Sequence, residues 1–419
     1  MNILHISTSD YRGGSGRAAY RIHHGLMARG VGSRMLVGSR STGEKEIAPI
    51  ASHRLTVLDL LSTSLCDRLS LQYLFYPSSF ALPRHPWFRE SDVVQLYNTH
   101  GSYFSHTVLP RLSRAKPVFW RLSDMWPMTG HCVHAFDCTR WRTGCGNCPI
   151  PAEYPGLRRD TTAFLWRTKR ALYARSQIEV VAPSRWIAQL AQESPLLGRF
   201  PVHVVPNGLD LSVFQPIPKN VAREVLRLSP ERKVVLFAAA SLSDPHKGLK
   251  PAMGALAAWA QTLREPPVLL AVGGHQVDVA VPAGIEMRQL RHTESEDFMA
   301  ILYSAADATV LPTAADTSPN VLLESLACGT PAVTFDVGGC GELVTHMVSG
   351  YVARPGDGED LARGLALVLG DDAVRARMAA AGIAAIAERH TVQRQVETLA
   401  GLYRAALERR AETRGETET

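Results

Sequence analysis

Short apolar runs alternate with amphipathic helical patterns along almost the whole chain. In the first half, runs rich in β-branched residues predict strands at 2–6, 35–37, 93–97, 118–122 and 179–182, and helical patterns occupy 16–29 and 161–175. In the second half, the runs "VVLFAAA", "VLLAVGG", "ATVLPT" and "AVTF" alternate with helical patterns near 249–263, 294–305 and 319–328. This alternation predicts an α/β protein built from β-α-β units, with parallel sheets covered by helices on both faces.

The segment "PVHVVPNGLDLSVFQP" carries Pro, Asn and Gly near its centre and is the predicted domain boundary. We therefore expect two doubly wound domains, at 1–205 and 206–390. A helix and charged tail at 391–419 are expected to pack back on the first domain. Open parallel sheets bind ligands at the carboxyl ends of their strands, so functional residues should follow the strands directly.

Composition describes an ordinary globular chain: of its 419 residues, 46% are hydrophobic and 20% are charged. We see no leader pattern and no apolar run of the roughly 18 residues that a spanning helix needs, which predicts a cytoplasmic location. Residues 1–200 hold 25 Lys and Arg against 13 Asp and Glu, whereas the rest holds 20 against 26. A basic first half predicts an anionic partner, and the scattering of its basic residues argues against nucleic acid.

Two loops after predicted strands carry residues suited to anions. In "YRGGSGRAAY", Gly13, Gly14 and Gly16 lead into a helix, where glycines let backbone N–H groups approach a phosphate. A tight strand-to-helix turn would explain the same glycines. In "LSDPHKGL", Lys247 precedes the next helix and could reach an anionic group, although a single lysine in a loop is often only solvated.

The segment "DTSPNVLLESLACGTPAV" places a carboxylate inside an apolar helix. Ser318 is the predicted N-cap and Pro319 suits the first turn. The N–H groups at 319–322, except the one that proline lacks, would face a ligand such as a diphosphate. Glu324 follows one turn later. It either accepts hydrogen bonds from the hydroxyls of a bound ligand or lies on a narrow solvated strip of the helix.

A cysteine-rich patch lies within 130–150, in "TGHCVHAFDCTRWRTGCGNCP". Its four cysteines are Cys132, Cys138, Cys145 and Cys148. The last two form a C-x2-C pair that is typical of half a tetrahedral zinc site, with His131 and His134 as competing ligands. We expect a closed, structural zinc site; the alternative is that reduced cysteines pack as small hydrophobic residues.

Taken together, these segments resemble glycosyltransferase family 4, a group of retaining enzymes with the GT-B fold. "PNGLDLSVFQP", "HKGL" and "LLESLACGTPAV" match family motifs in order and spacing, and "GGSGRAA" resembles the glycine loop of the first domain. The resemblance implies two Rossmann-like domains facing a central cleft. The patch after "DMWPMTGHC" is similar to one in a subgroup of bacterial polysaccharide glycosyltransferases.

The resemblance also implies roles for individual residues. Glu324 would bind the ribose of a nucleotide sugar, and Lys247 would neutralise the departing diphosphate. The other implied donor contacts are Gly14, Ser15, Gly16, Asp316, Ser318, Pro319, Asn320 and Val321. Asp316 stands where the family has its first Glu, Ser241 and Leu242 stand where an Arg is common, and Ser123 and Asp124 replace a usual His-Asp pair. Lys247, Asp316 and Asp124 are the predicted catalytic residues.

The implied activity is transfer of a sugar from a UDP- or GDP-sugar to a glycan or a polyprenyl-diphosphate-linked saccharide, with no cofactor for catalysis. The alternative is a non-catalytic sugar-nucleotide-binding or scaffold protein. Peripheral attachment to an anionic membrane is also expected. Its predicted contacts are Arg12, Arg17 and Arg21, or Arg167, Lys169 and Arg170 on a helix that also carries Phe164, Leu165 and Trp166.

Overall fold

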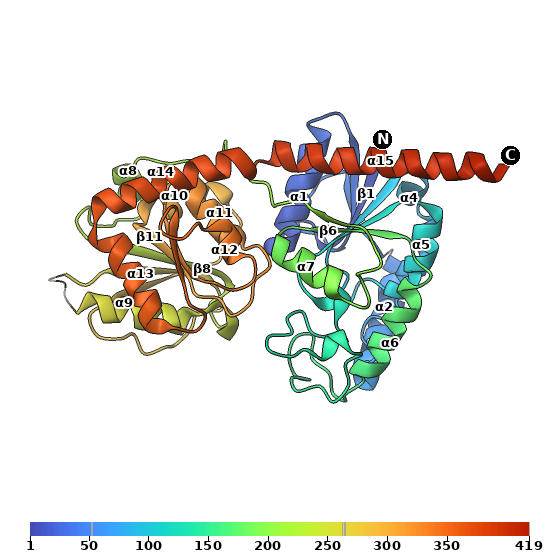
Figure 1. Cartoon of the computed structure of the whole chain (residues 1–419), viewed down its shortest axis with the longest axis horizontal. Coiled ribbons are helices and arrows are strands. Elements are labelled where there is room, and N and C mark those ends of the chain that lie inside the picture. The colour runs from blue at the N-terminus through green and yellow to red at the C-terminus, as the bar shows by residue number, and fades with distance from the viewer. Residues whose placement is uncertain (52, 262, 264, 419) are drawn as a thin grey trace. The chain divides into compact units, whose positions relative to one another are not determined.

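The structure is a computed structural model that describes residues 1–51, 53–261, 263 and 265–418. The described chain divides into two compact units. The first unit comprises residues 1–208 together with 392–419, and the second comprises residues 209–391. Each unit is a parallel sheet with helices on both faces, as Figure 1 shows.

The first unit is built on a seven-stranded parallel sheet with the strand order β3-β2-β1-β4-β5-β6-β7. Its strands are β1 (Asn2–Ser9), β2 (Gly32–Ser39), β3 (Ile47–Pro49), β4 (Val93–Leu96), β5 (Val118–Arg121), β6 (Ile178–Ala182) and β7 (Val202–Val204). All five strands predicted in this half are confirmed. The short strands β3 and β7 were not predicted, and β7 lies inside the segment interpreted as the domain boundary.

The helices of the first unit are α1 (Gly13–Met27), α2 (His53–Leu69), α3 (Pro77–Ala81), α4 (Pro86–Glu90), α5 (Leu109–Ala115), α6 (Thr162–Tyr173), α7 (Arg185–Glu193) and α15 (Val392–Glu418). Successive residues of β1 enter different cores, because side chains alternate along a strand. Ile3 packs with residues of α1 and α15, whereas Leu4 and Ile6 pack in the core on the opposite face.

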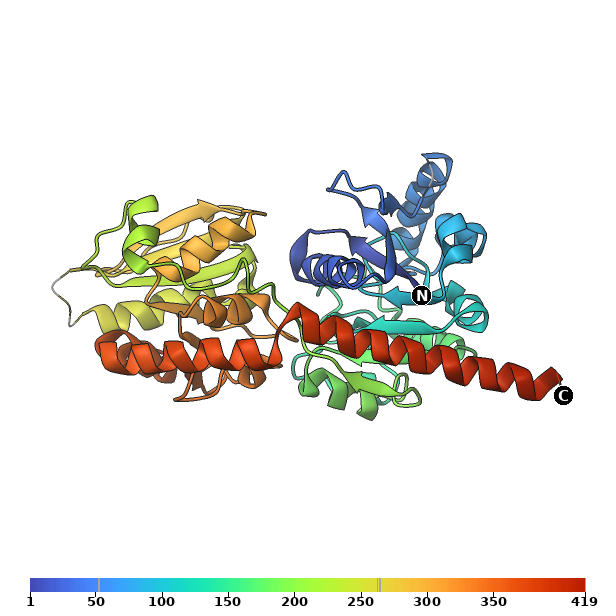
Figure 2. The same ribbon diagram turned by 90° about the horizontal axis from the view of Figure 1, so that it is seen from above.

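The long helix α15 packs against α1 and the sheet of the first unit (Figure 2). Val396, Leu399 and Tyr403 are buried in the core that they share with β1 and α1. The Tyr403 hydroxyl donates a hydrogen bond of 2.8 Å to the side-chain oxygen of Gln95 on β4. This helix therefore belongs to the first unit although it follows the whole second unit in sequence.

The second unit is built on a six-stranded parallel sheet with the order β10-β9-β8-β11-β12-β13. Its strands are β8 (Val234–Ser241), β9 (Val268–Gly274), β10 (Glu286–Arg291), β11 (Ala308–Leu311), β12 (Ala332–Phe335) and β13 (Gly350–Ala353). The order of these strands is the doubly wound Rossmann order, in which the direction of succession reverses between β8 and β11. The four strands predicted in this half are confirmed.

The helices of the second unit are α8 (Lys219–Val225), α9 (Leu249–Ala260), α10 (Glu296–Ala305), α11 (Asn320–Ala327), α12 (Cys340–Leu343), α13 (Gly358–Gly370) and α14 (Asp372–Arg389). On β8, Leu236 packs in the core of α10 and α11, and the neighbouring Val235 and Phe237 pack in the core of α9 and α13. The sheet is thus buried on both faces, which explains why its central strands read as continuous apolar runs.

Candidate functional site

In the second unit, two loops that follow neighbouring strands lie against each other. The loop after β8 ends in the turn Pro245–Lys247, and the loop after β11 runs from 312 to 319. The His246 carbonyl oxygen accepts hydrogen bonds from the Ala314 N–H at 2.7 Å and from the Thr313 hydroxyl at 3.1 Å. These bonds bring Lys247 Nζ to 2.7 Å from Asp316 Oδ2. The structure therefore joins two of the residues that the sequence predicted separately.

Glycines make this close approach possible. Gly248 has φ +85°, and a Cβ there would lie 2.1 Å from the Pro312 carbonyl oxygen. Gly338, just after β12, has φ +61°, and a Cβ there would lie 1.8 Å from the Asp316 carbonyl oxygen. The Gly339 N–H donates to that same oxygen at 3.1 Å. The sequence interpretation missed Gly338, although "DVGGCGE" carries a pair of glycines directly after a strand.

The ion pair also fixes the protonation of the lysine. Burial by itself lowers the pKa of Lys247, but the negative charge of Asp316 and its hydrogen bond outweigh burial and hold the pKa above the ordinary value. The lysine side chain is 28% exposed and that of Asp316 is 17% exposed. The site therefore presents a partly exposed ammonium group that stays charged at neutral pH.

Glu324 is buried in the helix that follows this loop. It is 2% exposed, so the interpretation as a solvated strip is wrong. The Tyr303 hydroxyl, on α10, donates a hydrogen bond of 3.0 Å to Glu324 Oε2. Helix α11 begins at Asn320 with Pro319 as its N-cap residue, one position later than predicted for the Ser318 cap. Ser318, Pro319, Asn320 and Val321 thus span the start of the helix, directly after Asp316.

In the first unit, the glycine turn follows β1, next to the end of β5. The Ser123 hydroxyl donates to the Ser15 hydroxyl at 3.0 Å, and α1 already begins at Gly13. A Cβ at Gly16 would lie 3.0 Å from the carbonyl carbon of Tyr11, so packing alone requires a small residue there. Gly14 and Ser15 are the members of the predicted trio that this packing does not explain.

Asp124, also after β5, is paired with a histidine that the sequence interpretation did not select. Asp124 Oδ2 lies 2.8 Å from His100 Nε2, and its Oδ1 accepts the Trp126 N–H at 2.9 Å. Burial raises the pKa of Asp124, but the charge of His100 and these hydrogen bonds outweigh burial and lower it. His100 follows β4, and its position after a strand is the signal that could have identified it.

The four cysteines of the patch line one small cavity of about 20 Å³, together with His131 and Trp141. His131 Nε2 lies 3.3 Å from Cys148 Sγ. Burial raises the pKa of Cys132 to about 12 and that of Cys145 to about 11, so these thiols are neutral unless a metal displaces their protons. Among the described residues, no three of these sulfurs lie within 4.8 Å of one another. The donor set fits zinc, but the loop must close further to bind it.

The basic residues predicted to meet a membrane are only partly on the surface. Arg21, Leu165, Trp166 and Lys169 are buried. The Lys169 ammonium group donates to the carbonyl oxygens of Trp126 and Thr129, at 2.6 and 3.0 Å. Helix α6 therefore cannot offer the contact as predicted, although Phe164, Arg167 and Arg170 are exposed.

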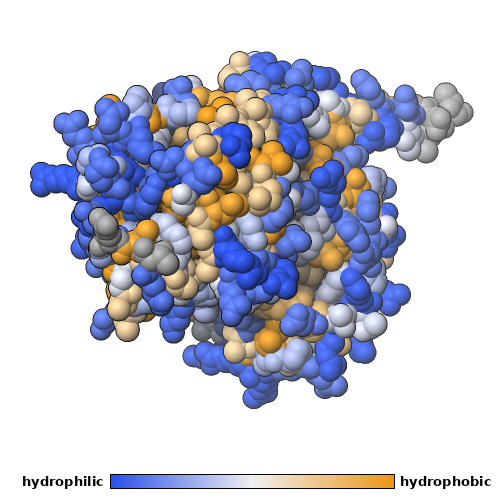
Figure 3. Space-filling model, turned by 60° about the vertical axis from the view of Figure 1, so that its left-hand side comes forward, coloured by the Kyte–Doolittle hydropathy of each residue, from blue (hydrophilic) through white to orange (hydrophobic). Residues whose placement is uncertain are grey.

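A different helix, α2, exposes a row of large apolar side chains. The exposed members are Val57, Leu58, Leu60, Leu61, Leu65 and Leu69, and Leu60 and Leu61 are each 64% exposed. By contrast, hydrophobic residues on the face in Figure 3 are interspersed with hydrophilic ones, as on most protein surfaces. In the described part of the chain, no helix combines the length and the hydropathy needed to span a bilayer.

Comparisons with known proteins agree with this description. Residues 219–385 match the family model "Glycosyl transferases group 1". The chain is 34% identical over 221 residues to a D-inositol 3-phosphate glycosyltransferase of Thermobispora bispora, covering 50% of this chain and 51% of that protein. It is 24% identical over 227 residues to the putative colanic acid biosynthesis glycosyl transferase WcaC of Escherichia coli, covering 51% and 55%. The chain thus spans about half the length of these relatives.

A solved structure extends the likeness in fold. HepE of Anabaena, in complex with UDP-glucose, superposes with a TM-score of 0.64 at 18% identity, covering 96% of this chain and all of that one. At this identity the likeness concerns the fold, and it agrees with the predicted pair of parallel-sheet α/β domains.

We predict that Gly338→Ala destabilises the second unit and disturbs the Lys247–Asp316 pair. The new Cβ would meet the Asp316 carbonyl oxygen in a left-handed backbone conformation, which typically costs about 1–3 kcal/mol. Thermal and denaturant unfolding measure the change. The matched control is Gly254→Ala in α9, where an added Cβ meets nothing within 4 Å and should stabilise by about 0.5–1 kcal/mol. Equal stability of the two variants would contradict this account.

Proposed function

We propose that this chain, which carries a glycosyl transferases group 1 domain at residues 219–385, transfers a sugar from a nucleotide-sugar donor to an acceptor hydroxyl with retention of configuration. One observation carries the proposal: a charged lysine, an ion-paired aspartate and a buried glutamate gather where the strand order of the second unit reverses. Such a switch point is the usual place for a nucleotide in a doubly wound sheet.

The start of α11 suits the donor diphosphate. The first N–H groups of a helix lack partners within the helix, and the aligned peptide dipoles place partial positive charge there. Lys247 adds a full positive charge on the neighbouring loop. Glu324, one turn into the helix, would accept hydrogen bonds from the ribose hydroxyls, while Tyr303 orients its carboxylate.

The reaction that fits these groups breaks the bond between the anomeric carbon and the diphosphate oxygen. The acceptor oxygen forms its bond to that carbon on the same face, and the acceptor proton passes to the leaving diphosphate. Lys247 stabilises the negative charge that develops on the diphosphate, so catalysis rests on positioning and charge stabilisation. Asp316 would contact the donor sugar as well as Lys247. On this scheme the transfer itself needs no cofactor.

The donor class is to be tested first with UDP-glucose, the ligand named for the HepE structure, alongside GDP-sugars. At a given concentration, a donor that binds more tightly raises the unfolding temperature more. A transferase also hydrolyses its donor slowly, passing the sugar to water and releasing the nucleotide. Binding without any release of nucleotide, with or without acceptors, would instead identify a sugar-nucleotide-binding or scaffold protein. No stabilisation by any nucleotide sugar would contradict both functions.

The acceptor that we propose is a growing cell-surface polysaccharide or its lipid-linked precursor. This rests on the likeness to WcaC, which is named for colanic acid biosynthesis, and on the resemblance of the cysteine patch to a polysaccharide subgroup.

We predict that Glu324→Ala weakens donor binding at least tenfold. The variant loses charge-assisted hydrogen bonds that are typically worth about 1.5–3 kcal/mol. Calorimetry with the donor identified above measures the change. Glu359→Gln, which alters an exposed carboxylate in the first turn of α13, is the control and should bind normally. Unchanged affinity in Glu324→Ala would refute the ribose contact.

We predict that Lys247→Ala lowers kcat more than it raises KM for the donor. Loss of a group that stabilises charge in the transition state typically costs about 10²-fold or more in kcat. The control is Lys250→Ala, which removes an exposed lysine three residues further along. A change confined to KM would mean that Lys247 binds ground state and transition state equally.

We also propose one structural zinc held by Cys132, Cys138, Cys145 and Cys148. Cys145 and Asn147 have positive φ, a backbone conformation that is costly for residues with a side chain and that a metal crosslink would help to maintain. Burial lowers the pKa of Lys169 to about 7, and thiolates at Cys145 and Cys132 would raise it again and favour the charged form of the lysine. A closed zinc site of this kind supports folding and has no open position for catalysis.

The zinc proposal predicts about one tightly held zinc per chain after dialysis against a weak chelator. Elemental analysis should show that Cys145→Ser with Cys148→Ser loses this zinc, whereas Cys66→Ala, in α2, retains it. Metal-free protein with the same unfolding temperature as the zinc form would overturn the assignment.

For location, we propose peripheral attachment to an anionic membrane through the exposed apolar row of α2. The packing of the first unit does not explain why six large apolar side chains of α2 are exposed to water. Exposed apolar patches of this kind mark interaction surfaces. Exposed arginines of the basic first half, such as Arg12, Arg167 and Arg170, would add attraction to anionic lipid.

We predict that the protein sediments with anionic vesicles at low salt and less with neutral ones. Leu61→Glu with Leu65→Glu should abolish sedimentation, because two charges would enter the apolar contact. Rising salt should weaken binding of the unaltered protein. Negligible sedimentation with both vesicle types would contradict the location, and altered oligomeric state in the variant would assign α2 to self-association instead.

A further inference from the structure

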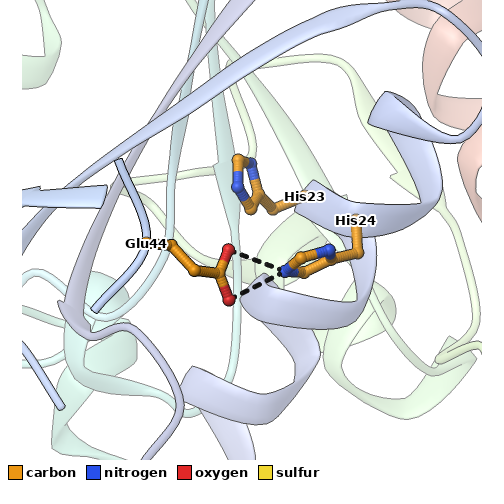
Figure 4. A group of neighbouring side chains, drawn as sticks. All are labelled: His23, His24 and Glu44. Carbon is orange, nitrogen blue, oxygen red and sulfur yellow. Dashed lines mark hydrogen bonds and ion pairs between the residues drawn. The ribbon is translucent and has the colours of Figure 1, made fainter. Parts of the chain in front are cut away.

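Two histidines and a glutamate converge in the first unit. His23 and His24 are neighbours on α1, and Glu44 lies on the segment between β2 and β3 (Figure 4). One potential ligand atom from each residue lies within 4.8 Å of the other two. His23 is ten residues beyond Gly13, so about 15 Å of helix separates this cluster from the glycine turn.

The distances within the cluster suit a metal ion. His24 Nε2 lies 3.0 Å from Glu44 Oε2 and 3.3 Å from Glu44 Oε1. Two ligand atoms in a tetrahedral zinc site, with bonds of about 2.0–2.1 Å, are about 3.3 Å apart. The side chains of His24 and Glu44 are 41% and 27% exposed, so an ion can enter from solvent.

His23 supplies the independent observation. The residue is completely buried, and its Nε2 has no hydrogen-bond partner within the described structure. A buried imidazole nitrogen without a partner is costly, because the group has lost its water and gained nothing in exchange. The cluster therefore includes a buried ring whose capacity to bind is not fully used by the protein itself.

Hydrogen bonds already orient the ligands in the way that metal sites require. His23 Nδ1 lies 2.7 Å from the Ser33 hydroxyl, and this hydrogen bond holds the ring in place. The Tyr20 hydroxyl donates to Glu44 Oε1 at 2.5 Å and fixes the carboxylate.

We propose that His23, His24 and Glu44 bind a divalent first-row transition metal ion of the zinc class. Two imidazole nitrogens and one carboxylate form a donor set preferred by such ions, whereas Ca²⁺ and Mg²⁺ prefer oxygen ligands alone. Three protein ligands leave a further position for water or a small anion.

The ion would fasten the segment between β2 and β3 to α1. Asp10, at the end of β1, already holds the other end of this segment. Its carboxylate accepts hydrogen bonds from the backbone N–H groups of Ser41 and Thr42 and from both of their hydroxyls. A metal at Glu44 would fix the same segment at a second point, so binding should raise the stability of the first unit.

The test is titration of the full chain with Co²⁺, followed by its visible spectrum, and with Zn²⁺, followed by thermal unfolding. Loss of even an outer partner of a metal ligand typically costs about 10–100-fold in affinity, so loss of a direct ligand should cost at least tenfold. Glu44→Gln and His24→Gln are the test variants, both at partly exposed positions that tolerate the change. Glu46→Gln, an exposed carboxylate two residues away, is the matched control.

The spectrum separates this site from the cysteine patch, because thiolate ligands give an intense charge-transfer band and nitrogen and oxygen ligands do not. We expect a thiolate-free Co²⁺ species in the unaltered protein and in Glu46→Gln. The affinity of this site for Co²⁺ should fall at least tenfold in Glu44→Gln and His24→Gln. The same species should persist when Cys145 and Cys148 are replaced by Ser. Equal affinity in all variants, or no such species at any Co²⁺ concentration, would overturn the proposal.

Discussion

The parallel pairing of β8 with β11 is the constraint on which the candidate site depends. Ala308 and Thr309 pair with Val235 and Leu236, although these strands are far apart in sequence. Because neighbouring parallel strands end at the same edge of a sheet, their loops must leave that edge side by side. This geometry places Lys247 beside Asp316 across 69 residues of chain. The pairing of β4 with β5 does the same for His100 and Asp124 in the first unit.

The carboxylates of Asp124 and Glu324, near these strand ends, are buried, and burial of a charge costs free energy. An ionised carboxylate loses several kcal/mol of hydration when it is removed from water, unless hydrogen bonds or an opposite charge compensate. Asp124 receives such compensation from His100 and the Trp126 N–H. The Tyr303 hydroxyl donates a hydrogen bond to the buried Glu324.

The sequence predicted the central strands well because they are buried on both faces and are continuously apolar. It missed β10, where "EMRQLR" reads as polar, and β7, which sits among turn residues. The sequence interpretation placed Lys169 on a basic surface. In the structure its ammonium group donates hydrogen bonds to the carbonyl oxygens of Trp126 and Thr129, which a sequence pattern does not reveal. Gly338 and His100 act only through partners far away in sequence. Lys247 and Glu324 could be singled out because they lie in short motifs of the family that the sequence resembles, and their roles stay predictions.

The Lys247–Asp316 pair bears on how a donor would bind under the proposed function. An ammonium group has three N–H donors, and the hydrogen bond to Asp316 uses one of them. The lysine can therefore bind a diphosphate without leaving Asp316, and the carboxylate then holds the ammonium group in one orientation. Without a donor, the same carboxylate offsets the effect of burial, which by itself lowers the pKa of the lysine. Aspartate is one methylene shorter than the glutamate common in family 4. Asp316 still reaches Lys247 at 2.7 Å, because Gly248 and Gly338 let the neighbouring loops approach closely.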